Sequence, residues 1–240
     1  TTDERGATLI HPKGNRDAPP SGRMPRTGYF FDTIVRQEPI DAATLDPADN
    51  LEEYTVVTEA DLADLETDLA AAEATGRAVI AMLPGTALGD IAFVPAPGLE
   101  HPKGIRDITE WYISVRRRPD YVRRVFEAQV EIALENLARI HARVGDRFDA
   151  VMTCGTDFGT QTGAFCSVDT FLDLWAPYYR QVNGWIHEHT AWKTFKHSCG
   201  SVERFMPSFI ECGFDIINPV QCSAANMEAE HLKREYGRDL

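Results

Sequence analysis

The stretch that decides the fold is KTFKHSCGSVERFMPSFIECGFDIINPV, residues 193–220. Its first five residues, 193–197, are typical of a short strand, and so are residues 215–220. Between these two strands we predict a helix over residues 201–212 that stops at Gly213. A strand, a helix and a second strand in this order form a βαβ unit, in which the two strands lie parallel.

The same alternation extends towards the N-terminus. Residues 78–83, AVIAML, form a continuous apolar run of the kind that buried parallel strands show, and residues 149–154, DAVMTC, predict the next strand. Helices are expected over about 58–75, 107–117, 119–144 and 226–236, and Thr58 and Asp61 resemble a capping pair at the start of the first. A further helix is expected to begin at a cap on Ser167, and its apolar face comprises Phe171, Leu174, Trp175, Tyr178 and Val182.

Four strands that alternate with helices predict an α/β fold with a parallel sheet. Both a TIM-type barrel and a doubly wound sheet fit this order. The glycine pattern of the dinucleotide-binding kind, Gly-x-Gly-x-x-Gly, follows none of the predicted strands. We therefore favour a TIM (β/α)8-type barrel, of which this chain holds about four central βα units.

Residues 1–50 differ from the rest because they are rich in glycine, proline and charge. We expect a hairpin and an irregular lead-in there, and a single barrel domain over residues 1–240. The chain begins without methionine, and its last residues resemble the approach to a further strand. On this basis we expect a barrel that is truncated at both ends.

Charge and cysteine usage narrow the function classes. The net charge of −13 repels phosphate backbones and argues against a nucleic-acid partner. No run of 18 apolar residues predicts a membrane span, and no signal pattern is visible at the N-terminus. Five cysteines, an odd number in a chain of this length, are typical of reduced thiols, so we expect a cytoplasmic protein.

Functional residues of parallel α/β folds gather where strands end. His197 ends one predicted strand, and Cys199 follows two residues later. An imidazole and a thiolate at this spacing suit a zinc ion. The pair also fits a hydrogen-bonded histidine beside a small buried cysteine, and the residues alone leave both interpretations open.

Other strand ends offer further candidates. Cys154 and Cys222 end or follow neighbouring strands, so either is a candidate third metal ligand, although each also fits a small buried side chain. Asp157 and Gln161 lie in a glycine-rich loop. The Asp157 carboxylate fits three functional roles there, as a general base, as a partner of a substrate nitrogen or as a hydrogen-bond acceptor of a metal-bound histidine. It fits equally well a structural role as a loop cap. Gln221 follows the last predicted strand and joins them as a candidate catalytic residue.

Several of these segments resemble the uroporphyrinogen decarboxylase superfamily. The resemblance is carried by FKHSCGSV at 195–202 and by IECGFDIINPVQ at 210–221. TDFGTQ at 156–161 and WAPYYR at 175–180 bring it closer to the corrinoid-dependent methyltransferase branch. The resemblance implies a (β/α)8 barrel, of which this chain would hold about the third to sixth strands.

The methyltransferase branch binds zinc through a His-x-Cys pair and a later cysteine. His197 and Cys199 match the pair, and the later cysteine would fall beyond Leu240. Decarboxylases of the superfamily need no metal and carry an arginine-rich N-terminal segment, which this chain lacks. The resemblance thus favours methyl transfer.

The sequence therefore predicts a zinc-containing methyltransferase subunit that works with a corrinoid carried by a partner protein and acts on a small methylated substrate. Asp157, Gln161 and Gln221 would orient the substrate or the ligands. A metal-free decarboxylase, in which Asp157 would stabilise positive charge on a pyrrole nitrogen, is one alternative. A barrel that binds a small molecule or a partner without turnover is another. The methyl donor, the acceptor and the oligomeric state, including a homo-oligomer, stay open.

Overall fold

The computed structural model describes all of residues 1–240. The chain packs into two compact units. Unit 1 comprises residues 1–53 and 91–125, and unit 2 comprises residues 54–90 and 126–240. The single domain expected from the sequence stays a prediction.

Unit 1 contains a three-stranded antiparallel sheet in the order β1-β2-β3. Its strands are β1 (Thr8–Ile10), β2 (Gly22–Met24) and β3 (Asp32–Thr33). The expected N-terminal hairpin is thus extended by a third short strand. The same unit holds the 3-10 turns η1 (Pro12–Gly14) and η2 (Pro47–Leu51) and the helix α2 (Ile108–Arg117).

Buried polar side chains hold unit 1 together. The side chain of Arg106 is 1% exposed, and its guanidinium donates to Glu53 Oε1 at 2.7 Å. The Asn50 Oδ1 atom accepts from the Ile105 N–H at 2.8 Å and from the Tyr121 hydroxyl at 2.7 Å. These bonds satisfy groups that burial would otherwise leave without partners.

Unit 2 is built on a four-stranded parallel sheet in the order β4-β5-β6-β7. The strands are β4 (Ile80–Met82), β5 (Ala150–Cys154), β6 (Lys193–His197) and β7 (Ile216–Asn218). The parallel α/β architecture predicted from the alternation is confirmed. Closure into a barrel is not shown, because β4 and β7 are the two edges of the sheet.

The helices of unit 2 connect these strands, and two of the helices predicted from the sequence differ from the observed ones. The helix expected after Ser167 is broken at Trp175, because Pro177 lacks the N–H that a helix interior needs and so stands in the first turn of a new helix. The helix expected over 201–212 is a 3-10 turn followed by one short helix. The helices are α1 (Glu59–Glu73), α3 (Pro119–Val144, which begins in unit 1), α4 (Val168–Leu174), α5 (Ala176–His189), η3 (Glu203–Phe205), α6 (Met206–Glu211) and α7 (Ala229–Tyr236).

The helix α1 begins as predicted. The Thr58 side chain accepts from the Asp61 N–H at 3.2 Å, and the Asp61 carboxylate accepts from the Thr58 N–H at 2.7 Å. This reciprocal pair satisfies two N–H groups that the start of a helix leaves unpaired.

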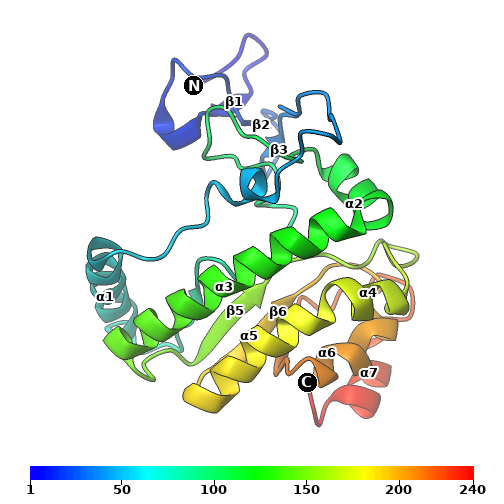
Figure 1. Ribbon diagram of the computed structural model, residues 1–240. Helices are drawn as coiled ribbons and strands as arrows, with labels where there is room; N and C mark the ends of the chain where they lie inside the picture. Colours follow the sequence, from blue (N-terminus) through cyan, green and yellow to red (C-terminus); the bar gives the residue numbers. More distant parts are fainter. The chain divides into compact units, whose positions relative to one another are not determined.

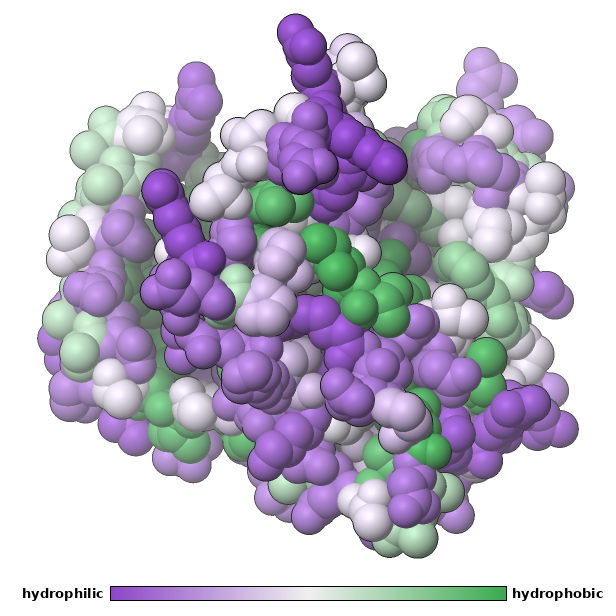
Figure 2. All heavy atoms as spheres, turned by 90° about the horizontal axis from the view of Figure 1, so that it is seen from above, coloured by the Kyte–Doolittle hydropathy of each residue, from purple (hydrophilic) through white to green (hydrophobic).

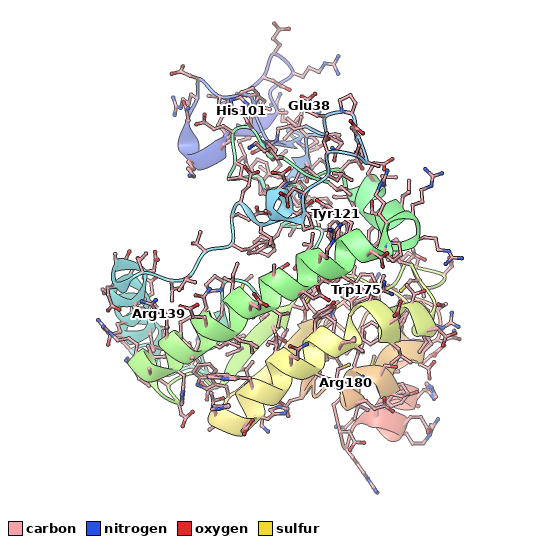
Figure 3. The ribbon with its side chains drawn as sticks, in the orientation of Figure 1. Glu38, His101, Tyr121, Arg139, Trp175 and Arg180 are labelled. Carbon is pink, nitrogen blue, oxygen red and sulfur yellow. The ribbon has the colours of Figure 1, made fainter.

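The core of unit 2 lies between the sheet and the helices on one of its faces. Helices α3 and α5 run along this face of β5 and β6 (Figure 1). Trp175, at the junction of α4 and α5, is fully buried there, and its indole N–H donates to the Leu88 carbonyl at 3.1 Å (Figure 3). On β4, by contrast, Ile80 and Met82 are 52% and 65% exposed while Ala81 between them is buried. The sheet thus has one covered and one open face at this edge.

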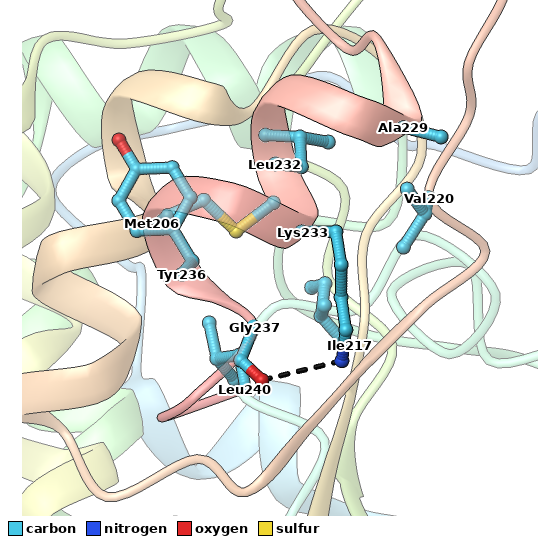
Figure 4. A pocket seen from close by; sticks show the side chains of 9 residues that line it. All are labelled: Met206, Ile217, Val220, Ala229, Leu232, Lys233, Tyr236, Gly237 and Leu240. Atoms are coloured by element: carbon cyan, nitrogen blue, oxygen red, sulfur yellow. Dashed lines mark hydrogen bonds between the residues drawn. The ribbon is translucent and has the colours of Figure 1, made fainter.

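The helix side of β7 contains an apolar pocket of about 230 Å³ (Figure 4). The Lys233 ammonium beside it donates to the Gly237 carbonyl at 3.2 Å. The residues that line it are Met206, Ile217, Val220, Ala229, Leu232, Lys233, Tyr236, Gly237 and Leu240.

One face of the molecule shows mainly hydrophilic side chains, with hydrophobic ones in small groups among them (Figure 2). None of the helices combines the length and the apolar character that crossing a membrane requires.

Candidate metal centre

Three potential metal donors meet where β5 and β6 end. His197 is the last residue of β6, Cys199 follows two residues later, and Asp157 comes three residues after the end of β5. Their donor atoms all lie within 4.8 Å of one another. His197 Nε2 is 3.4 Å from Cys199 Sγ and 3.8 Å from Asp157 Oδ1. We call these three residues the donor group.

The spacing of the donor group suits a zinc ion. Zinc bonds of about 2.0–2.3 Å at tetrahedral angles place neighbouring donor atoms about 3.4–3.6 Å apart. The distances of 3.4 and 3.8 Å from His197 Nε2 to the other two donor atoms are close to these values. A thiolate and an imidazole favour zinc over the hard cations magnesium and calcium. The residues present therefore fit a metal such as zinc and leave a fourth coordination position open.

Asn218 orients the imidazole of His197. The two residues are partners in the parallel register of β6 and β7, and His197 Nδ1 lies 2.8 Å from Asn218 Oδ1. Because an amide oxygen can only accept, Nδ1 carries the proton and Nε2 presents its lone pair to the donor group. Histidines that bind metals are commonly held by such a bond on the other ring nitrogen. Asn218 is not among the site residues predicted from the sequence.

Hydrogen bonds join the loop after β5 to the loop after β6. The Cys199 N–H donates to Asp157 Oδ1 at 2.6 Å, and the Phe158 N–H donates to Ser198 Oγ at 2.9 Å. The carboxylate that belongs to the donor group is thus aimed by the backbone of another member of the same group. This arrangement fixes Asp157 before any ion arrives.

The same two loops touch through glycine backbones. A Cβ atom on Gly200 would lie 2.3 Å from the Gly159 carbonyl carbon, and one on Gly159 would lie 2.6 Å from the Ser201 nitrogen. Gly200 also has φ +85°, which residues with side chains rarely adopt. The contact allows the Ser201 N–H to donate to the Thr160 carbonyl at 2.8 Å. Glycine is therefore required at both positions for the loops to approach this closely.

The Cys199 thiol holds its proton while no cation is present. Burial raises the pKa of Cys199, and the negative charge and hydrogen-bonding of Asp157 raise it further. A cation bound between the two residues would reverse this effect, because it stabilises both negative groups. Metal binding must therefore release the thiol proton and strengthen as pH rises.

A buried lysine binds backbone carbonyls next to two members of the donor group. Lys196 is fully buried, and its ammonium donates to the carbonyls of Thr156 at 2.7 Å and His197 at 2.9 Å. The ammonium also lies 4.9 Å from the centre of the Phe158 ring. Burial lowers the pKa of Lys196, and the nearby negative groups oppose that shift. Lys196 is not among the site residues predicted from the sequence.

Neither cysteine that was predicted as a possible third metal ligand belongs to the donor group. Cys154 is 2% exposed and points into the helix layer, where its sulfur accepts from the Tyr179 hydroxyl at 2.9 Å and contacts Thr156 Oγ1 at 2.8 Å. Cys222 is exposed and lies outside the donor group. The group that lies beside His197 and Cys199 is the Asp157 carboxylate, which the contact between the loops turns towards His197. The identity of the third metal ligand stays a prediction.

The two predicted glutamines, Gln221 and Gln161, lie outside the donor group. Gln221 Oε1 accepts from the Gly200 N–H at 2.8 Å and so supports the loop that carries Cys199. Gln161 has an exposed side chain, and its carbonyl accepts from the Ala225 N–H at 2.9 Å. The catalytic roles of Asp157, Gln161 and Gln221 stay predictions.

Comparison with known proteins gives one distant structural likeness. No family model matches the sequence, and no curated protein matches it closely. Among solved structures, the chain is similar to a methyltransferase from Methanosarcina mazei, with 12% sequence identity and a TM-score of 0.37. The match covers 58% of this chain and 35% of that protein, so the chain spans about a third of its length.

Proposed function

We propose that this chain carries the metal site of a methyltransferase that works with a corrinoid protein. The observation that carries the proposal is the donor group, in which Asp157, His197 and Cys199 bring their donor atoms within 4.8 Å at the carboxyl ends of two parallel strands. The resemblance to corrinoid-dependent methyltransferases, carried by residues 156–161 and 175–180 together with 195–202 and 210–221, supports methyl transfer as the reaction.

When bound, a zinc ion would act as a Lewis acid that lowers the pKa of a substrate thiol or polarises a methylated heteroatom. The protein's part is to hold the donors. Asn218 keeps the Nε2 lone pair of His197 available, and the Cys199 N–H keeps Asp157 Oδ1 in place. Donors held in this way need little rearrangement when the ion and the substrate arrive.

The methyl-transfer step balances with a corrinoid as the reaction partner. In the direction from corrinoid to thiol, the bond between cobalt and the methyl carbon breaks and a bond between sulfur and carbon forms. Cobalt keeps the electron pair, and the thiol proton is released to solvent. The residues of this chain take no redox part in that step.

Metal content tests the first half of the proposal. Purified protein is expected to hold about one zinc per chain, as the single donor group implies. H197A and C199A should lose the metal, because two remaining donors bind zinc weakly. C222A is the matched control, since it removes an exposed thiol outside the donor group. Absence of zinc from the unchanged protein would contradict the proposal.

Turnover tests the second half. Zinc-loaded protein should transfer the methyl group of free methylcobalamin to a small thiol, followed by the absorbance change of the corrinoid. C222A should retain this activity and C199A should lose it. Decarboxylation of uroporphyrinogen by metal-free protein would instead establish the carboxy-lyase alternative. Inertness in both assays, together with a stable partner complex, would favour a non-catalytic barrel.

A further inference from the structure

The buried ammonium of Lys196 links the two strand ends that carry the donor group. Lys196 lies on the helix-facing side of β6, whereas the neighbouring residue His197 points to the opposite side. We propose that Lys196 is a positioning residue that sets the separation of Asp157 from His197 by binding the Thr156 and His197 carbonyls together. The inference rests on the proposed metal function.

The backbone explains why such a link is needed. The pairing of β5 with β6 is regular from Ala150 to Met152 and then shifts register before Cys154. The bulge disrupts the ladder locally, and the pairing resumes with Cys154 opposite Lys196, which is the last pair of the two strands. The Thr156 carbonyl belongs to the peptide bond that leads into Asp157. The two ammonium hydrogen bonds of 2.7 and 2.9 Å therefore connect the two segments beyond the last ladder pair, at the point where the ligands begin.

Stability alone does not account for a lysine at this position. Moving an ammonium out of water is costly, and a well-packed apolar side chain of similar volume is often at least as stabilising. The surrounding rings of Phe158, Tyr179 and Phe209, at 4.9, 5.6 and 5.8 Å from the ammonium, offset part of that penalty. An apolar residue cannot donate to both the carbonyl of Thr156, in the loop after β5, and the carbonyl of His197, at the end of β6.

The test compares K196M and K196Q with the unchanged chain. Methionine keeps the length and apolar stem of lysine but donates nothing, and glutamine keeps a donor on a shorter stem. The matched control is T194V, because Thr194 is also buried on the helix side of β6, but at the strand end away from the donor group. Folding of each variant is checked by circular dichroism and urea unfolding.

Hydrogen exchange in the metal-free protein is the first readout. The amides of Phe158 and Cys199 report directly on the bonds between the two loops. In K196M both amides should exchange faster by about tenfold or more, because the loops open locally. In T194V these amides should exchange at the original rate even if the fold is less stable.

Zinc affinity, measured by competition with a chelator, is the second readout. K196M should bind zinc about 10–100-fold more weakly, the usual effect of losing a group that supports metal ligands, with K196Q between K196M and the unchanged chain. The cobalt-substituted K196M should also show altered ligand-field absorption. T194V should match the unchanged chain in both measurements.

The outcomes separate this inference from the proposed function. Unchanged exchange at both amides in folded K196M would overturn the role of Lys196, even if the protein binds zinc. Failure of both Lys196 variants to fold would also overturn it, in favour of a purely stabilising role. If the unchanged chain binds no zinc, the proposed function fails, while the exchange of the two amides still decides whether Lys196 holds the loops together.

Discussion

The contact between Gly159 and Gly200 gives the sharpest prediction about the donor group. In G159A the new Cβ atom would lie 2.6 Å from the Ser201 nitrogen and 2.9 Å from the Cys199 carbonyl oxygen, against at least 3.4 Å for an ordinary contact. Both clashing atoms belong to the backbone, so no side chain can rotate away. The loops must therefore part by about 0.8 Å.

This displacement determines how much stability and zinc affinity G159A should lose. The bonds from Cys199 to Asp157 and from Phe158 to Ser198, now 2.6 and 2.9 Å, would reach the limit of hydrogen-bond geometry. Two weakened bonds at about 1 kcal/mol each set an upper limit, and relaxation reduces it, so the free energy of unfolding should fall by about 1–2 kcal/mol. Zinc affinity should fall about 10–100-fold, because the Asp157 carboxylate moves away from the other donors.

The assay pairs urea unfolding of the metal-free protein with chelator competition for zinc. G163A is the matched control, because it lies in the same loop and its Cβ would meet nothing within 4 Å. It should leave stability within about 0.5 kcal/mol and affinity unchanged. If G159A and G163A behave alike in both measurements, the close contact does not hold the donor group together, and the reasoning is refuted.

Three further perturbations follow from the same structure. N218L removes the hydrogen-bond acceptor of His197 Nδ1. Zinc affinity in chelator competition should therefore fall about 10–100-fold with little loss of stability. An unchanged affinity would show that another contact orients the imidazole. Burial raises the pKa of Asp215, but hydrogen bonds, first among them that from the Thr194 N–H, outweigh this and lower it. The resulting stabilisation is complete above the ordinary aspartate pKa of about 3.9 and is lost as pH falls through the lower folded value, so D215N should flatten the acid limb of urea midpoints measured against pH. R106M leaves buried carbonyls and partly buried carboxylates of unit 1 without their donor. Calorimetry should show that the free energy of unfolding falls by about 3 kcal/mol. A fall of less than about 1 kcal/mol would mean that solvent replaces the donor.

The strands and most helices of unit 2 could be predicted because their signals are local. The strand at 193–197 has the bounds that the sequence predicted, and the helix from Pro119 to Val144 likewise. The helix break at Trp175 was missed although its signal, Pro177, is local, because the apolar face continues across the break. Closure into a barrel rests on resemblance and is not shown by the four strands.

The donor group could be predicted only in part, for a physical reason. His197 and Cys199 are two residues apart, so the end of one strand brings them together and the motif alone predicts that they are close. The third donor depends on which way another loop turns. Cys154 stands on the next strand, but its side chain faces the helices, as does that of its register partner Lys196. Sequence distance from a strand end does not reveal this direction.

The geometry of Asp157 makes the backbone part of the metal chemistry. Its Oδ1 atom accepts the Cys199 N–H and is also the carboxylate oxygen nearest His197 Nε2. One atom therefore serves both the loop contact and the donor group, and neither can change without the other. Because that contact requires glycine at position 159, zinc affinity should respond to substitutions that touch no donor atom. A site assembled from donor chemistry alone would be indifferent to them.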